Sequence, residues 1–318
     1  MLFIDTALVM KDYIAVLVTA FNRPEKLERV FRHLSSIPGL RLYFACDGPR
    51  TESERPLVDR CRAIARKFIS EPSRLRLLDH HLGCYRAMFE AISWFFSLET
   101  EGIINEDDVL IDKSFIDCAR VLLPALRNDP QFYHINSFIV PEAVDSKHPF
   151  FVGIYANSWG WATWRDRWEK FSHQMVLDQP NWKAIRDSAG SLKLALFFAF
   201  AFILTRQGKI NSWHFRWTYS IWINHGLTLT PRLRLSENFG IDSTATHCSK
   251  EFHLIGARHS LPTVSECELL AFDSRVRERD QLILLSYSLP SPWRKISRMF
   301  ISIMAPVSVF RFIRRRFR

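Results

Sequence analysis

The chain has 318 residues, of which 47% are hydrophobic, so it can bury a large core and is not a disordered protein. Its formal net charge is +10, but residues 289–318 hold eight basic residues and no acidic ones, which leaves +2 for the rest. That nearly neutral remainder contains no stacking or groove-reading module, and we therefore expect no nucleic-acid partner.

The first ten residues include Asp5 and have no basic stretch before an apolar core, so we expect no secretory signal. The six cysteines are scattered along the chain without close pairs. This spacing predicts neither a zinc site nor a disulfide framework, and it favours a reducing compartment.

Two apolar runs near the start of the chain predict buried parallel strands. The run 14–20 ends before Asn22 and Arg23 and is followed by a helical pattern that continues to Leu34. The run 40–46 ends in Asp47 and a glycine turn. Ligands of open α/β sheets bind beyond the carboxyl ends of the strands, so we expect these polar residues to border a site.

The most informative motif is the acidic triplet Glu106, Asp107 and Asp108, which follows the apolar run 102–104. An amphipathic helix with apolar positions between residues 85 and 96 precedes this strand. Carboxylates gathered at a strand end suit Mg²⁺ or Mn²⁺ carrying a phosphate. A solvated acidic turn is the alternative. The polar ends of the two earlier strands favour the metal site and a nucleotide-sugar ligand.

A tryptophan-rich segment covers residues 157–168. Trp159 and Trp161, with a glycine between them, offer flat apolar faces for a sugar ring, and we predict that they face a ligand. Trp164 and Trp168 lie one helical turn apart and are predicted to be core residues.

The apolar run 194–204 is too short to cross a bilayer, which needs about 20 residues. We predict a helix that is buried in the protein or lies in an interface, with burial in the protein favoured. Next, the segment 211–217 contains His214, and although a lone histidine is more often structural than catalytic, its surroundings make it a candidate.

Taken together, seven stretches resemble the inverting nucleotide-sugar glycosyltransferases of GT-A fold, in particular a bacterial family-two-like group related to eukaryotic N-acetylglucosaminyltransferase I. The stretches are LVTAFNRPEKL, FACDGPR, HHLGCYRAMFEAISWFF, EGIINEDDVLIDKSF, NSWGWATWRDRW, NSWHFRWTYSIW and ENFGIDSTATH. They occur in the family's order and cover roughly residues 12–250. The acidic triplet combined with the tryptophan-rich pattern makes the resemblance specific.

The resemblance implies an α/β fold with a Rossmann-like mixed central sheet flanked by helices. It divides the chain into a nucleotide-sugar-binding half, residues 1–112, and an acceptor-binding half, residues 113–255. Residues 256–318 form a C-terminal extension that ends in a basic amphipathic helical tail.

The resemblance also implies roles for individual residues. Asp108 is expected to touch the metal, with His247 near the metal or the diphosphate, and Asp107 lies nearer the ribose. The remaining donor-binding candidates are Glu106 of the same motif, Asp47 for the uracil ring, Asn22 and Arg23 in the first nucleotide loop, and Arg86 at the diphosphate.

One position departs from the family. Where the family usually has an aspartate as general base, this chain has His214. A histidine with an ordinary pKa of about 6.5 is mostly unprotonated near neutrality and can take a proton from an acceptor hydroxyl. The alternatives are that Asp242 is the base, or that turnover is lost. Because the acidic triplet is complete, we predict a working enzyme.

The predicted function is metal-dependent inverting transfer of a sugar from a nucleoside-diphosphate donor, with a UDP-sugar expected, to a glycan or lipid-linked hydroxyl. The family suggests bacterial surface polysaccharide assembly. One rival is a sugar- or nucleotide-binding protein without turnover at the membrane. The other is a nucleotidyltransferase, which the lack of a glycine-rich loop with lysine near the amino terminus disfavours.

The C-terminal tail interleaves basic and large apolar residues between Trp293 and Arg318. Such a segment suits the interface of an anionic membrane, so we expect a cytoplasmic protein held peripherally at the inner face of the cell membrane. A terminal helix packed on the body is the alternative.

Overall fold

A computed structural model describes residues 12–139, 148–240 and 272–273. Most of its strands belong to one mixed sheet with the order β11-β7-β9-β6-β8-β4-β1-β2-β3. The strands are β1 (Ile14–Ala20), β2 (Leu40–Cys46), β3 (Leu75–Leu77), β4 (Glu101–Glu106), β6 (Phe132–Asn136), β7 (Phe150–Gly153), β8 (Trp161–Trp164), β9 (Leu227–Pro231) and β11 (Phe272–Asp273). A separate antiparallel ladder joins β5 (Val109–Ile111) to β10 (Ser236–Asn238).

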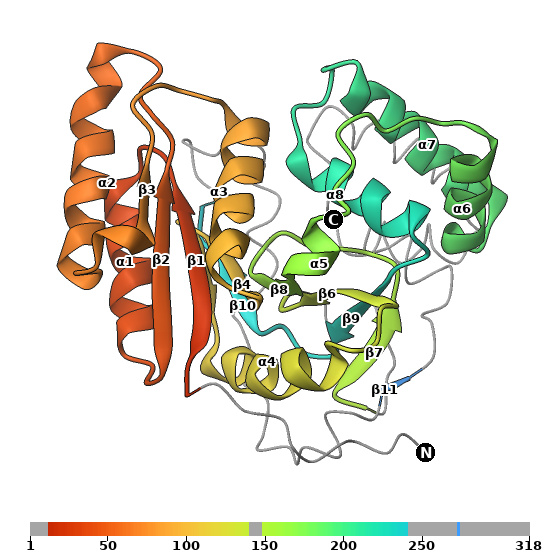
Figure 1. Cartoon of the computed structure of the whole chain (residues 1–318), viewed down its shortest axis with the longest axis horizontal. Coiled ribbons are helices and arrows are strands. Elements are labelled where there is room, and N and C mark those ends of the chain that lie inside the picture. Colours follow the sequence, from red (N-terminus) through yellow and green to blue (C-terminus); the bar gives the residue numbers. More distant parts are fainter. Residues whose placement is uncertain (1–11, 140–147, 241–271, 274–318) are drawn as a thin grey trace, which may run out of the picture.

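The helices are α1 (Pro24–Ser35), α2 (Arg55–Phe68), α3 (Cys84–Leu98), α4 (Lys113–Leu126), α5 (Arg165–Trp168), α6 (Gln179–Ala189), α7 (Leu192–Arg206) and α8 (Trp213–Ile223), with short 3-10 turns at Glu52–Glu54 and Pro72–Arg74. In Figure 1, α1 and α2 lie at one end of the sheet, and α6, α7 and α8 lie together at the other.

The sheet separates two hydrophobic cores, because alternate residues of a strand point to opposite faces. In β1, Val16 and Val18 join the core under α1, α2 and α4, whereas Ala15 and Leu17 join the core that contains α3 and α5–α8. β1 is buried on both faces, which explains why its sequence is a continuous apolar run.

The structure confirms the predicted mixed α/β architecture with a large central sheet flanked by helices. The predicted strands 14–20 and 40–46 and the helix before the acidic triplet are present. The single sheet contains strands from both predicted halves, and residue 112 is the N-cap of α4, so the division at that point stays a prediction. The basic tail lies outside the described residues.

Candidate active site at the strand ends

The candidate site lies where the strand order of the sheet changes direction. β1 pairs in parallel with β2 on one side and with β4 on the other, so the carboxyl ends of all three strands meet at one edge. From β1 the chain first adds β2 and β3 outward and then places β4 on the opposite side of β1. Such a switch point is where open α/β sheets bind ligands.

The acidic triplet stands at this switch point. Glu106 ends β4 with a partly exposed side chain, and Asp107 and Asp108 form the turn into β5, exposed to only 1% and 7%. The turn is held from inside by Asn105, whose Nδ2 donates to the carbonyl oxygens of Val109 at 2.9 Å and Glu106 at 3.1 Å. The strand end therefore presents its carboxylates in a fixed, largely desolvated arrangement.

Arg23, from the loop after β1, contacts two of these carboxylates. Its Nη1 donates to Asp108 Oδ2 at 2.6 Å, its Nε donates to Asp107 Oδ2 at 3.3 Å, and its Nη2 donates to Asp107 Oδ1. Burial by itself would lower the pKa of Arg23, but the carboxylates of Asp107 and Asp108 outweigh burial and raise it. Arg23 thus stays charged and acts as an internal counter-ion.

One guanidinium does not balance three neighbouring carboxyl groups. Burial raises the pKa of Glu106, and the charge of Asp108 raises it further. Burial also raises the pKa of Asp107, against the opposing effect of Arg23. Ionising all three carboxyl groups at the strand end is therefore unfavourable, and a second cation bound there would make it less so.

The chemistry of these donors fits a divalent cation. Asp108 Oδ1 is buried and has no hydrogen-bond partner among the described residues. A bound cation would satisfy this oxygen. In the described ranges, no three His, Cys, Asp or Glu side chains converge to hold a metal by themselves. Mg²⁺ and similar ions commonly bind one or two carboxylates and take their other ligands from substrate phosphates and water. Asp108, with Glu106 beside it, suits that mode.

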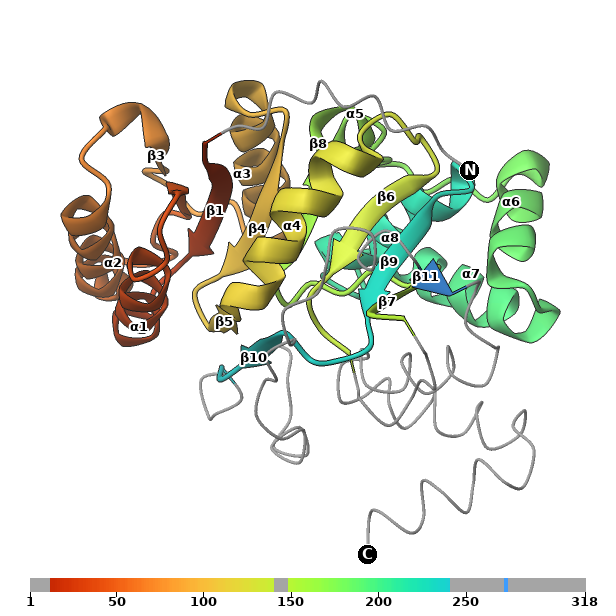
Figure 2. The same ribbon diagram turned by 90° about the horizontal axis from the view of Figure 1, so that it is seen from below.

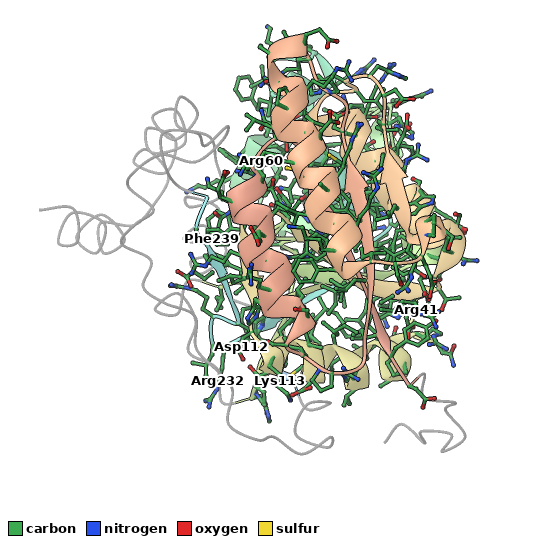
Figure 3. The ribbon with its side chains drawn as sticks, turned by 90° about the vertical axis from the view of Figure 1, so that its left-hand side faces the viewer. Arg41, Arg60, Asp112, Lys113, Arg232 and Phe239 are labelled. Carbon is green, nitrogen blue, oxygen red and sulfur yellow. The ribbon has the colours of Figure 1, made fainter. Side chains whose placement is uncertain are left out.

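A distant segment closes over Asp108. The β5–β10 ladder pairs Val109 with Asn238, and the Phe239 N–H then donates to the Asp108 carbonyl oxygen at 2.9 Å. Figure 2 shows β10 beside β5, and Figure 3 shows Phe239 beside α1, where Arg29 lies 4.4 Å from its ring centroid. A Cβ atom on Gly240 would lie 2.0 Å from Asp108 Oδ2, so only glycine fits there.

Asp47 lies at the same edge, where its carboxylate contacts other groups of the protein. Its Oδ1 accepts from the Gly48 and Leu82 N–H groups, both at 2.9 Å, and its Oδ2 accepts from the Gly83 N–H at 3.1 Å. His81 Nδ1 lies 2.8 Å from the same Oδ2. These four contacts engage both oxygens of the carboxylate, and the contact of Asp47 with a uracil ring stays a prediction.

Asp47 fixes the loop that leads into α3. Leu82 and Gly83 directly precede that helix, whose first residue is Cys84. The pKa of the Cys84 thiol is raised to about 12, first by burial and then by the charges of Glu106 and Asp47. The start of α3 therefore lies near both Glu106 and Asp47.

The other two predicted donor residues are near this edge but do not touch the acidic triplet. Asn22 Nδ2 donates to Glu54 Oε1 at 3.3 Å, which connects the first loop to the turn before α2. Arg86 lies exposed in the first turn of α3. An exposed arginine near the start of a helix is suitably placed to contact an anionic ligand.

The tryptophan prediction is wrong for Trp161. This side chain is fully buried and stacks on His134, with ring centroids 4.6 Å apart. Trp159 is partly exposed and packs edge-on against Phe138. Gly160, with φ at +76°, interrupts the extended alternation, so the two tryptophans enter different cores. Trp164 and Trp168 are core residues, as predicted.

His214 lies in the first turn of α8 and is partly exposed. Its Nε2 is 2.6 Å from the Ala156 carbonyl oxygen, so Nε2 carries the proton and Nδ1 holds the lone pair. Burial lowers the pKa of His214 to about 4, which keeps the imidazole neutral near neutral pH. A neutral imidazole with a fixed tautomer can accept a proton at Nδ1.

Two predicted residues, Asp242 and His247, lie outside the described residues. Conversely, sequence reasoning missed Gly240 as a residue packed against the Asp108 side chain, and it missed His81 as a partner of Asp47. The glycine gave a signal, because it follows the ENF stretch within a segment already singled out. His81 lies in another of these stretches, HHLGCYRAMFEAISWFF, but nothing in the sequence pairs it with a residue 34 positions earlier.

No protein-family model matches the chain, and a search of curated proteins finds no match. Among solved structures, the chain is similar to the mannosyltransferase PcManGT from Pyrobaculum calidifontis, whose structure is a complex with GDP-Man and Mn²⁺. The similarity covers 66% of this chain and 68% of that chain, with 12% sequence identity and a TM-score of 0.37.

Proposed function

We propose that the protein is a metal-dependent inverting glycosyltransferase of GT-A type, which moves a sugar from a nucleoside-diphosphate donor to an acceptor hydroxyl. The observation that carries the proposal is the meeting of Arg23, from the end of β1, with Asp107 and Asp108, from the end of β4, at the switch point of the sheet. Anionic groups and an arginine in a largely desolvated site suit a diphosphate bound together with a cation.

Each donor-binding residue has a defined part in this proposal. Asp108, with Glu106 beside it, would hold Mn²⁺ or Mg²⁺, and the bound ion would supply charge stabilisation for the departing diphosphate. Arg23 supplies a positive charge beside the same carboxylates, and Arg86 in the first turn of α3 adds a second. Asp107 orients Arg23 through two contacts.

The base of the donor is not specified by this site. The uridine expectation depended on Asp47, and the carboxylate of Asp47 is engaged by Leu82, Gly83, Gly48 and His81. The proposal therefore names the class, a nucleoside-diphosphate sugar, and leaves uridine, guanosine and the other bases to be ranked by experiment.

His214 is the proposed general base. Its proton is fixed on Nε2 by the Ala156 carbonyl, which leaves Nδ1 to accept the proton of the acceptor hydroxyl as that oxygen attacks the anomeric carbon. Ala156 begins a short segment that ends at Gly160, where a Cβ would lie 3.3 Å from Asn105 Oδ1. This segment connects the His214 anchor to the strand that carries the acidic triplet. Trp159, on the same segment, is the proposed acceptor contact.

The remaining parts of the proposal come from the sequence. The family resemblance supports a glycan or lipid-linked acceptor and a role in bacterial surface polysaccharide assembly. The composition of the basic tail supports a cytoplasmic enzyme that is peripheral at the inner face of the cell membrane.

The test starts with a thermal-shift panel of UDP-, GDP-, ADP- and dTDP-sugars, with and without Mn²⁺. At least one donor should stabilise the protein more strongly with Mn²⁺ than without it, and that donor should be hydrolysed slowly when the ion is present. Asp108→Asn should abolish both effects. The matched control is Asp117→Asn on α4, which removes an exposed carboxylate paired with Lys113 and should change neither.

His214 is tested separately. His214→Ala should lower turnover by roughly 10²–10⁴-fold, the usual contribution of a general base, while the Mn²⁺-dependent thermal shift with donor stays as in the wild type. Equal turnover in the variant would remove His214 from the mechanism. Retention of the Mn²⁺-dependent shift by Asp108→Asn would remove the metal role.

A further inference from the structure

The segment that joins β7 to β8 is largely buried, although it forms neither a helix nor a strand. Ile154, Tyr155 and Ala156, in this segment, are buried. Buried carbonyl groups outside helices and sheets need side-chain or water partners, because leaving them unpaired is costly. Each carbonyl oxygen of residues 154–157 accepts a hydrogen bond from a side chain, and we name these four residues the carbonyl strip.

Strand β6 supplies two of the four donors. Asn136 Nδ2 donates to the Tyr155 carbonyl oxygen at 2.9 Å, and Asn136 Oδ1 accepts from the Asn157 N–H at 2.6 Å. His134 Nε2 lies 3.0 Å from Asn136 Oδ1 and 3.1 Å from the Asn157 carbonyl oxygen. Both side chains are buried. Their hydrogen bonds therefore hold the backbone on either side of Ala156.

The proton of His134 is fixed by a third side chain. The indole Nε1 of Trp217 can only donate, and it lies 3.1 Å from His134 Nδ1. Nδ1 is therefore the acceptor, and Nε2 carries the hydrogen that points to the strip. Burial, with a smaller contribution from His214, lowers the pKa of His134 to about 3. The ring stays neutral and fully buried, so it holds the strip and does not exchange protons with a substrate.

Helix α8 supplies the other two donors, from the helices that cover one face of the sheet (Figure 1). Trp222 Nε1 donates to the Ile154 carbonyl oxygen at 2.7 Å, and His214 Nε2 donates to the Ala156 carbonyl oxygen at 2.6 Å. Trp222 is fully buried, whereas His214 is partly exposed. The exposed member of the set is thus anchored to a carbonyl group whose place is set by β6.

We propose that His134 and Asn136 are positioning residues for His214. A buried polar network whose members are all hydrogen-bonded makes the backbone that it contacts rigid. The Ala156 carbonyl selects one ring form of His214 only while that backbone is held in place, and the selected form leaves Nδ1 as the proton acceptor. This inference rests on the proposed role of His214 as general base, but the state of its ring can be measured without turnover.

The ring of His214 can be observed by nitrogen NMR after labelling the histidines with ¹⁵N, with the spectrum of His214→Ala giving the assignment. In the wild type, Nε2 of His214 should carry the hydrogen at neutral pH, and the ring should not titrate near its ordinary pKa of about 6.5. His134→Phe keeps an aromatic ring but removes a donor to the strip. His214 should then show signals of both tautomers, and Asn136→Ala should have the same effect.

Turnover separates positioning from stability. His134→Phe should lower kcat by roughly 10²-fold, the usual cost of misplacing a catalytic group by about 1 Å, and leave the KM for the donor near its wild-type value. In the His214→Ala background the same substitution should have little further effect on kcat, since it acts through His214. His134→Gln can place an amide donor near the former Nε2 and should recover much of the lost turnover.

The matched control is Thr163→Val. Thr163 is also fully buried, and its Oγ1 donates at 2.6 Å to the carbonyl oxygen of Tyr133 in β6, which lies outside the strip. The substitution should lower the melting temperature because it removes a buried hydrogen bond. The nitrogen signals of His214 and the value of kcat should stay as in the wild type.

Unchanged His214 signals in His134→Phe would overturn the inference, as would an equal change in Thr163→Val. A hydrogen on Nδ1 of His214 in the wild type would overturn it without any variant, which covers the case in which His134→Phe does not fold. Independent losses of kcat that multiply in the double variant would also reject it. If the wild type turns over no donor but His134→Phe still alters the His214 ring, the proposed transferase role fails and the positioning role stands.

Discussion

Arg23 Nη1 lies 2.6 Å from Asp108 Oδ2, although the two residues are 85 positions apart and follow different strands. The carboxylate that is the best candidate for a metal ligand is therefore already paired with a cation of the protein. A bound divalent ion would share Asp108 with Arg23, and it would free part of the guanidinium to face the diphosphate.

Arg23→Gln should destabilise the metal-free protein by about 3 kcal/mol, because it leaves the buried Asp107 and Asp108 without their counter-ion. Mn²⁺ should then raise the melting temperature of the variant more than that of the wild type, since the ion replaces the lost positive charge. Differential scanning fluorimetry with EDTA or Mn²⁺ measures both effects.

Arg60→Gln is the control for Arg23→Gln. Arg60 pairs with Glu25 on the surface between α2 and α1, and both side chains are largely exposed (Figure 3). Its loss should change stability by less than about 1 kcal/mol, with no Mn²⁺ rescue. Identical Mn²⁺ responses in the two variants would contradict a shared cation site.

Glu106→Gln should stabilise the metal-free protein at neutral and higher pH. Because burial raises the pKa of Glu106 in the folded state, the folded protein binds a proton that the unfolded chain releases above its ordinary pKa of 4.5. Stability is therefore fully present below about pH 4.5 and is lost as pH rises through the folded-state pKa of about 8. The variant should be about 1 kcal/mol more stable near pH 8 and should show a flatter dependence on pH.

Urea unfolding in EDTA across this pH range tests the Glu106 prediction. The same variant should bind Mn²⁺ and donor more weakly, since a carboxylate is lost from the site. A variant that is less stable than the wild type at every pH would show that Glu106 is not held in an unfavourable charged state.

Gly240→Ala should impair the site without unfolding the protein. The new Cβ would lie 2.0 Å from Asp108 Oδ2 and 2.5 Å from Asp108 Cγ, so the carboxylate or the covering segment must move. Isothermal titration should show Mn²⁺-dependent donor affinity reduced by at least about tenfold. Gly190→Ala has nothing within 4 Å of its added Cβ and should leave donor affinity unchanged, at a backbone cost of about 1 kcal/mol.

Asp47→Asn should weaken every donor alike. An amide cannot accept at both of its ends, so the N–H group of either Leu82 or Gly83 would lose its acceptor, at a cost of about 1–3 kcal/mol. The loop before α3 would loosen, and UDP- and GDP-sugars should lose affinity by similar factors in the thermal-shift panel. A loss confined to uridine donors would instead support the uracil-reading role.

The pH–rate profile should show no titration of His214 near its ordinary pKa. With that pKa lowered to about 4, the imidazole is already neutral at pH 6, and kcat should fall only in more acidic solution. Between pH 6.5 and 4 the unfolded chain binds a proton that the folded imidazole does not, so stability falls as pH falls. An acid limb centred near 6.5 that disappears in His214→Gln would contradict the buried, neutral base.

Hydrophobic patterns along the chain predict the strands that border the site and the place of the acidic triplet. The continuous apolar run 14–20 is a strand buried on both faces, and the run 40–46, interrupted by Arg41, is a strand buried from Leu42 onward. The apolar run 102–104 before the acidic triplet predicts a strand that ends at these carboxylates, and in the structure Glu106 is the last residue of β4.

The partners of these residues follow from how the strands and helices pack in the fold. Trp159 and Trp161 look equivalent in the sequence, but the left-handed backbone of Gly160 sends them to opposite faces of the sheet. Asp108 receives its neighbours from Arg23 and Gly240 through the sheet order and the β5–β10 ladder. Hydrophobic periodicity specifies local elements, whereas contacts across 85 or more residues depend on how those elements pack, which no local pattern encodes.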